Sequence, residues 1–150
     1  MFFYFKPGFS GYFSLEGSEE LSEIKNPVIG LSDEEAIFQF NKDYVLYLLV
    51  SLGVQELHNT PLSSDTPKIL VRVNDEVFSA EVRKGRVSLR EREIDDEDII
   101  IWTSREEVVK MLRDKNYIES SFVSGKSGFQ LSSGKAELIA KGYLSLYNNL

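Results

Sequence analysis

The stretch over residues 68–89 constrains the fold of this chain most, because apolar and polar residues alternate along it in three short runs. Asn74-Asp75 and Lys84-Gly85 separate the runs. A period of two places the apolar residues on one face of a strand, and two-residue turns join antiparallel neighbours. The sequence therefore predicts consecutive antiparallel hairpins that bury one face.

The elements that follow come in an order that few folds share. An acidic tract over 91–98 leads into an apolar strand over 99–101. Ser104 and Glu107 have the spacing of a capping box and predict the start of a helix. Residues 117–123 and 128–131 resemble strands or extended segments, and an apolar stripe from about Lys135 predicts one final helix.

The first half of the chain predicts one long helix after an aromatic section. Helical spacing of apolar residues over 33–52, with Ser32 or Asp33 as cap, indicates that helix. Before it, seven of the first thirteen residues are Phe or Tyr, and we expect a hairpin of strands over 2–6 and 11–15. We interpret the chain as a single domain over 1–150, in which 1–30 is an N-terminal extension and 33–150 the core.

Composition excludes several classes of function. Twenty-four acidic against seventeen basic residues give a net charge of −7, and such a surface repels nucleic acid. The chain has no cysteine and one histidine, His58, which excludes disulfides and two-histidine metal sites. No apolar stretch approaches the roughly 20 residues of a membrane-spanning helix. We expect no catalytic residues, no metal, no cofactor and no integral membrane segment, and a cytoplasmic location.

Three motifs suggest chemistry that their surroundings do not support. Gly125-Lys126-Ser127 resembles a phosphate-binding loop, but Ser120 stands where that loop needs its first glycine, so a turn is expected. The acidic tract lacks the ligand spacing of a calcium loop and predicts a solvated loop. His58 lies in a polar stretch and is expected at the surface.

The second half of the chain resembles the sterol-carrier-protein-2 family, the SCP2-like lipid-binding domains. The resemblance rests on the hairpin over 81–87, Asp98 before its strand, Ser104 at the start of a short helix, and the sequence Ser-Phe-Val-Ser-Gly-Lys over 121–126. It extends to the final amphipathic helix. It covers roughly residues 68–150, and the helix over 33–52 takes the place of the family's leading helix.

The resemblance implies an α+β fold with a mostly antiparallel five-stranded sheet, helices on one face, and an apolar tunnel between them. Family members bind fatty acids, acyl-CoA, sterols or phospholipids without a catalytic residue, so the implied function is binding and transfer or presentation of such a lipid. The side chains implied to line the tunnel are Trp102, Val108, Met111, Leu112, Phe122, Phe129, Leu138, Ile139, Tyr143 and Leu146.

In a second interpretation the fold is the same, but side chains fill the space of the tunnel. Each implied lining residue is then ordinary core, and the protein is an interaction module without a ligand. In that case the aromatic N-terminal section forms a homodimer or docks on a larger enzyme. The same aromatic section serves the lipid-binding interpretation as a lid, and either function competes with a hairpin that simply completes the core.

Overall fold

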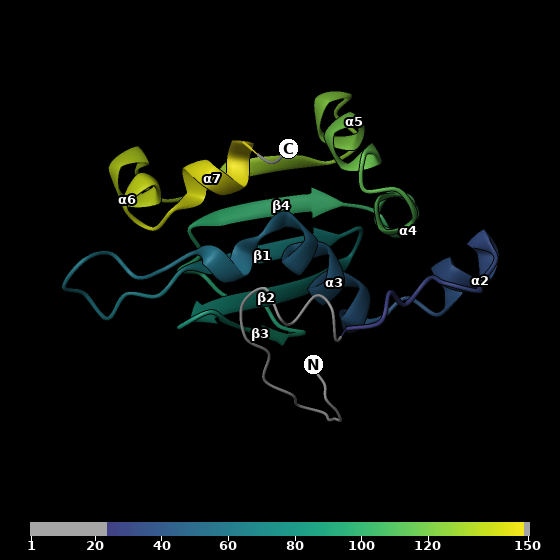
Figure 1. Cartoon of the computed structure of the whole chain (residues 1–150), viewed down its shortest axis with the longest axis horizontal. Helices are drawn as coiled ribbons and strands as arrows, with labels where there is room; N and C mark the ends of the chain where they lie inside the picture. The colour runs from purple at the N-terminus through teal and green to yellow at the C-terminus, as the bar shows by residue number, and fades with distance from the viewer. Residues whose placement is uncertain (1–23, 149–150) are drawn as a thin grey trace.

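The computed structural model describes residues 24–148, and the side chains of residues 24–146 (Figure 1). The hairpin expected over 2–6 and 11–15, with its possible function as a lid or a homodimer contact, lies outside the described residues. The described residues form one five-stranded sheet and the helices that pack beside it.

The sheet has the strand order β3-β2-β1-β4-β5. Its members are β1 (Lys68–Val73), β2 (Glu76–Arg83), β3 (Arg86–Arg90), β4 (Ile99–Thr103) and β5 (Gly128–Leu131). The two hairpin turns lie where the sequence predicted them. Between β2 and β3, Lys84 and Gly85 have φ values of 54° and 80°, the left-handed pair that a tight hairpin requires.

The sheet is mixed, whereas the SCP2-like resemblance implied a mostly antiparallel one. β1 pairs with β4 in parallel, from Ile69 opposite Ile99 to Val73 opposite Thr103, and the other three pairings are antiparallel. The parallel pair arises because residues 91–98 carry the chain from β3, at one edge, past β2 and β1 before β4 begins. Parallel neighbours require such a crossover.

One face of the sheet carries the main core. Ile69, Val71 and Val73 point into the core, where they join Phe78 and Ala80 of β2. Leu70 is 1% exposed but points to the opposite face, as alternation along a strand requires. In Figure 1, α3 (Lys42–Leu52) crosses the sheet in front of β1 and β2, over the face that holds the core.

The helix expected over 33–52 is two helices, α2 (Asp33–Phe38) and α3. Ser32 caps α2 in a reciprocal capping box with Glu35. The break arises because Asn41 forms a second N-cap, where its side chain accepts a hydrogen bond from the Asp43 N–H at 2.9 Å. Phe40, between the helices, turns inward, and its ring centroid lies 4.9 Å from that of Tyr44. A short 3₁₀ turn, η1 (Val54–Glu56), follows α3.

Two further segments differ from the sequence expectation. Residues 117–123 form a helix, α5 (Tyr117–Val123), and no strand, because Ile118 and Ser121 have the three-residue spacing that buries one helix face. The single final helix is divided into α6 (Lys135–Ala140) and α7 (Tyr143–Asn148). Gly142 divides them with a φ of +94°, which a continued helix does not permit.

The helix α4 (Arg105–Arg113) begins at Ser104, as the sequence predicted, and the Ser104 Oγ accepts a hydrogen bond from the Glu107 N–H at 3.1 Å. It packs against α2, α3 and α5. No helix within residues 24–148 combines the length and apolar character needed to cross a bilayer.

Candidate functional site

A small apolar groove lies between α7 and the strands β4 and β5. We call it the α7 groove, and its lining residues are Ile99, Phe129, Leu131, Tyr143 and Leu146. Ile99, Tyr143 and Leu146 are buried, whereas Leu131 is 62% exposed at the edge of the sheet. The free volume is about 30 Å³, which is room for a few water molecules at most. The groove is therefore shallow and too small to hold a lipid chain as it stands.

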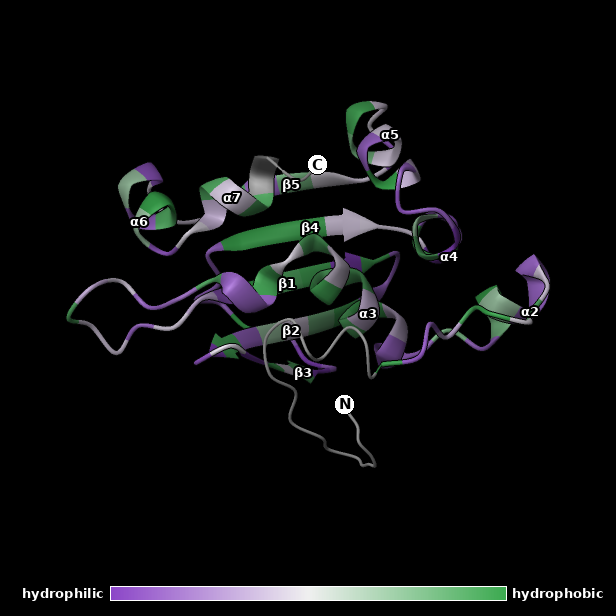
Figure 2. Ribbon diagram, viewed as in Figure 1, coloured by the Kyte–Doolittle hydropathy of each residue, from purple (hydrophilic) through white to green (hydrophobic). Residues whose placement is uncertain are grey.

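Three apolar side chains on β5, α6 and α7 are exposed, and one of them, Leu131, lines the groove. Leu131 on β5, Ile139 on α6 and Leu144 on α7 are 62%, 51% and 55% exposed. Figure 2 shows apolar stretches on α6 and α7 beside the strongly apolar β4. β5 is an edge strand, so one side of its backbone has no neighbouring strand within the described sheet.

Three of the ten residues implied by the SCP2-like resemblance line the α7 groove, namely Phe129, Tyr143 and Leu146. Phe122 stands beside them, with its ring centroid 5.1 Å from that of Phe129. Ile139 is half exposed on α6. The remaining apolar helix residues, Val108, Met111, Leu112 and Leu138, are buried in the core.

Trp102 lies on the other face of the sheet. Its neighbour Ile101 points into the core and is fully buried, so alternation turns Trp102 outward, where it is 42% exposed. Its indole covers Gly128, the cross-strand partner on β5, and leaves no room for a side chain there. Trp102 is thus separated from the α7 groove by the sheet itself.

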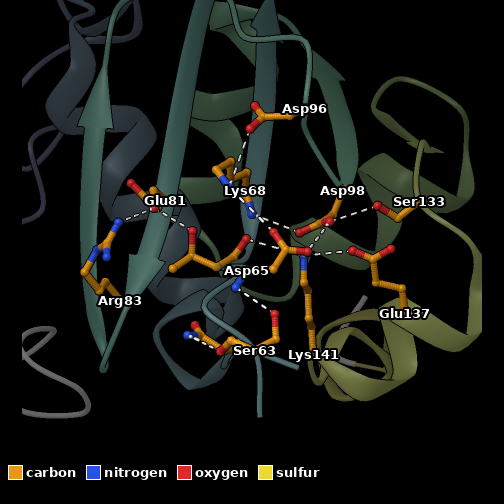
Figure 3. A network of polar contacts seen from close by, with 12 residues as sticks. Ser63, Asp65, Lys68, Glu81, Arg83, Asp96, Asp98, Ser133, Glu137 and Lys141 are labelled. Atoms are coloured by element: carbon orange, nitrogen blue, oxygen red, sulfur yellow. Dashed lines mark hydrogen bonds and ion pairs between the residues drawn. The ribbon is translucent and has the colours of Figure 1, made fainter. Parts of the chain in front are cut away.

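A polar cluster centred on the buried Asp98 and Lys141, the Asp98 cluster, lies at the start of β4 (Figure 3). It contains Asp65, Asp98, Ser133, Glu137, Lys141 and Tyr143. Asp98 is 2% exposed. One carboxylate oxygen accepts hydrogen bonds from Ser133 at 2.8 Å and Lys141 at 2.9 Å. The other accepts from the Lys68 N–H at 2.9 Å and the Tyr143 hydroxyl at 2.8 Å. Four donors saturate this carboxylate, so it has no lone pair free for general-base chemistry.

Lys141 is a buried cation among three carboxylates. Its side chain is 1% exposed, and its Nζ lies 2.9 Å from Asp98, 3.1 Å from Asp65 and 3.1 Å from Glu137. Burial alone lowers the pKa of Lys141, but the hydrogen bonds to these carboxylates outweigh it and raise the pKa above its ordinary value. Lys141 therefore stays charged at neutral pH and is not available as a nucleophilic amine.

Tyr143 connects the Asp98 cluster to the α7 groove. Its ring lines the groove, while its hydroxyl donates to Asp98. Burial, together with the charge of Asp98, raises the pKa of Tyr143 far above its ordinary value, so the hydroxyl remains a neutral donor. The position of α7 over the groove is consequently fixed by a buried carboxylate at the start of β4.

A second buried polar group, the Glu107 cluster, joins α4, α5 and the ends of β4 and β5. Glu107 accepts hydrogen bonds from Tyr117 at 2.8 Å and Ser121 at 2.7 Å. Ser127 lies 2.8 Å from the Ser121 hydroxyl and 2.7 Å from that of Thr103. A carboxylate only accepts, so Ser121 donates to Glu107, Ser127 donates to Ser121, and Thr103 donates to Ser127.

Glu107 remains ionised despite its burial. Burial acts to raise the pKa of Glu107, but hydrogen bonds from Ser121 and Tyr117 favour the charged form more strongly and lower the pKa below its ordinary value. The sequence indicated Glu107 only as a capping residue, and its carboxylate is used instead to hold α5 beside α4.

The Asp98 cluster includes positions that sequence reasoning placed in solvent. Asp98 belongs to the acidic tract that predicted a solvated loop, yet it is buried. The one sequence signal for Asp98 was the SCP2-like resemblance, which includes Asp98 as the residue that precedes the strand over 99–101. Lys141 gave no signal, because a lysine in an amphipathic helix is ordinarily at the surface. His58 is exposed, as predicted.

Comparisons with known proteins give fold likenesses only. No family model and no curated protein matches the chain. One similar solved structure is a double mutant of the sec-alkyl sulfatase PisA1, with a TM-score of 0.48 and 10% identity, over 78% of this chain and 17% of the sulfatase. Another is a UbiJ-SCP2 ubiquinone synthesis protein, with a TM-score of 0.39 and 12% identity, over 77% of this chain and 86% of that one.

Proposed function

We propose that this protein binds a long-chain lipid non-enzymatically, with the acyl chain held between α7 and the strands β4 and β5, and carries or presents it. The observation that supports this function is the α7 groove, whose five lining residues are all apolar or aromatic and whose border exposes Leu131. Each methylene removed from water contributes about 0.8 kcal/mol, so an apolar cavity suffices for affinity without any catalytic group.

The groove must widen to admit a chain. Its volume of about 30 Å³ is far below the 300–1,000 Å³ of ordinary small-molecule pockets. The element able to move is α7, a helix of six residues that follows the left-handed Gly142. In the proposed motion, Tyr143 stays bound to Asp98 while the end of α7 that carries Leu146 swings away from Ile99 and Phe129.

The test is the affinity for oleate, measured by displacement of a fluorescent fatty acid, in two variants of α7. Leu146→Asp places a charge in the groove, and we expect affinity to fall by about tenfold or more, because a buried leucine contributes 1.5–3 kcal/mol. Leu144→Asp is the matched control: it makes the same change on the same helix at a side chain that is 55% exposed. We expect the control to stay within about twofold of the unmodified protein.

A third variant distinguishes loss of lipid binding from loss of folding. Leu131→Asp changes a groove residue that is 62% exposed, so the fold tolerates it, while the apolar entrance is lost. We expect weaker oleate binding with an unchanged melting temperature. Wild-type affinity in both Leu131→Asp and Leu146→Asp would refute the acyl-chain site.

A second candidate function is a protein-interaction module with a filled core. The small volume of the α7 groove favours it, together with the exposed Leu131 on the edge strand β5. Analytical ultracentrifugation separates the two candidates. An interaction module sediments as an oligomer that Leu131→Asp dissociates and takes up no oleate, whereas a lipid carrier binds oleate whatever its oligomeric state.

A further inference from the structure

A second cavity lies on the face of the sheet away from the α7 groove. We call it the β2–β3 pocket; its volume is about 240 Å³. Its lining residues are Lys68, Ser79, Ala80, Glu81, Ser88, Arg90, Arg92, Ile94 and Asp96. The pocket is eight times the volume of the α7 groove, and polar residues dominate its wall.

Alternation along β2 and β3 places this pocket on the outer face. Ala80 and Val82 point into the core, so Ser79 and Glu81 between them point outward. Their cross-strand partners on β3, Arg90 and Ser88, share that face. The floor of the pocket is thus a patch of polar side chains from two paired strands.

The crossing segment over 91–98 forms the remaining wall. Two ion pairs hold it against the outer face: Glu93 lies 2.8 Å from Arg72, and Asp96 lies 3.5 Å from Lys68. Ile94, half-buried between them, lines the pocket. The acidic tract that the sequence suggested to be a solvated loop therefore encloses a space against the sheet.

The anionic residues of the pocket are already neutralised. Glu81 pairs with Arg83 at 2.7 Å and accepts a hydrogen bond from the Thr66 hydroxyl. Asp96 pairs with Lys68, as Figure 3 shows. Neither carboxylate is therefore left to repel an anion at full strength.

Two arginines and two serines of the pocket have no partner within the described part of the chain. Among the residues that the structure describes, neither Arg90 nor Arg92 has an ion-pair or hydrogen-bond partner for its guanidinium. Within the same described part of the chain, the hydroxyls of Ser79 and Ser88 also lack a partner. Ser79 is 5% exposed, which places its hydroxyl at the bottom of the pocket. A pocket lined by two arginines and two serines without protein partners offers unused hydrogen-bond donors.

We propose that the β2–β3 pocket binds a small molecule through a phosphate or carboxylate group, held by Arg90 and Arg92 with Ser79 and Ser88 as further donors. A guanidinium presents paired donors that match the oxygens of either group. The volume lies just below the range for drug-sized ligands, which favours a small metabolite. The sheet separates the pocket from the α7 groove, so the site is independent of the proposed lipid.

The experiment is an NMR titration of the full chain with inorganic phosphate and, separately, with succinate, at constant ionic strength set by sodium chloride. We expect the backbone amides of residues 79, 88, 90 and 92 to shift in a saturable way with at least one of the two anions. Tighter binding of phosphate identifies a phosphate ligand, and tighter binding of succinate identifies a carboxylate ligand.

The variants are Arg90→Gln with Arg92→Gln, against a control with the same change in charge, Lys84→Gln with Lys115→Gln. Both control lysines are exposed and outside the pocket. The arginine variant should weaken the binding by about tenfold or more, since a hydrogen bond to a charged group contributes 1.5–3 kcal/mol, and the control should leave it within twofold. Equal weakening in both variants means nonspecific attraction and overturns the site, as does the absence of saturable shifts with either anion.

Discussion

The Asp98 cluster and the Glu107 cluster both attach helices to the sheet, but through different chemistry. The Asp98 cluster ties α6 and α7 to the start of β4 through a buried cation and three carboxylates. The Glu107 cluster ties α4 and α5 to the sheet through one carboxylate and a chain of hydroxyls. The first depends on charge neutralisation, and the second depends on the direction of its hydrogen bonds.

The two clusters differ in how much other packing supports the helices that they attach. α4 also packs apolar residues, Val108, Val109 and Met111, into the main core, so the Glu107 cluster adds to an attachment that already exists. α6 and α7 have six residues each, and among the side chains described through residue 146 they contribute Leu138, Tyr143 and Leu146 to the core. For them the Asp98 cluster is the principal anchor, and for this reason the proposed lipid-binding motion is assigned to α7.

The largest effect is expected from Asp98→Ala. It leaves Lys141 buried with only the partly exposed Asp65 and Glu137 as partners, and breaking a buried ion pair in this way costs about 3–5 kcal/mol. Urea denaturation measures the loss. Hydrogen exchange should accelerate first over residues 135–148 and only later over α3.

Asp96→Ala is the matched control, because Asp96 is the same residue type two positions earlier and 61% of its side chain is exposed. The cost should be below about 1 kcal/mol. If Asp98→Ala is no more harmful than this control, or if exchange accelerates equally in α3 and α7, the anchor assigned to the Asp98 cluster is wrong.

A smaller effect is expected from Ser127→Ala in the Glu107 cluster. The Thr103 hydroxyl loses its acceptor and Ser121 loses a donor, but Ser121 still donates to Glu107, so the cost should be about 1–3 kcal/mol. Ser120→Ala, at an exposed serine, should stay within about 0.5 kcal/mol. Equal stability of the two variants in urea denaturation would show that the hydroxyl chain contributes nothing.

The smallest effect is a change in pH dependence. The pKa of Glu107 is lowered on folding, so its contribution to the free energy of unfolding is present above its unfolded pKa of about 4.3 and is lost as pH falls through the lower folded value. Glu107→Gln has no such carboxylate. Its stability, measured in urea between pH 2 and about pH 7, should fall less steeply in acid than that of the unmodified protein. Parallel curves would contradict the lowered pKa.

The hairpins and their turns could be predicted from the sequence because they depend on local alternation and on pairs such as Lys84-Gly85. The helix breaks could not be predicted, because at each one a cap or a left-handed backbone conformation competes with continuation of the helix. Asn41 ends one helix by capping the next, and Gly142 adopts a left-handed φ where its apolar neighbours favoured a continued helix. Residues 117–123 form a helix because tertiary packing buries Ile118 and Ser121 together.

The candidate site was predictable only in its apolar part. Phe129, Tyr143 and Leu146 follow from an apolar strand and an amphipathic helix that the resemblance placed together. Lys141 and Asp98 are 43 residues apart in the sequence, and nothing local indicates that two charged residues will be buried against each other. Trp102 was implied to line the tunnel, and one residue of strand register decides that it points to the other face.

The most direct test of the lipid-binding account is native mass spectrometry of the freshly purified full chain, followed by denaturation and identification of any released molecule. The account predicts a discrete adduct with the mass of a fatty acid, acyl-CoA, sterol or phospholipid, or such an adduct after incubation with oleate, and its loss in Leu146→Asp but not in Leu144→Asp. An apo mass that persists with oleate and oleoyl-CoA would contradict the account and leave the α7 groove as part of a filled core.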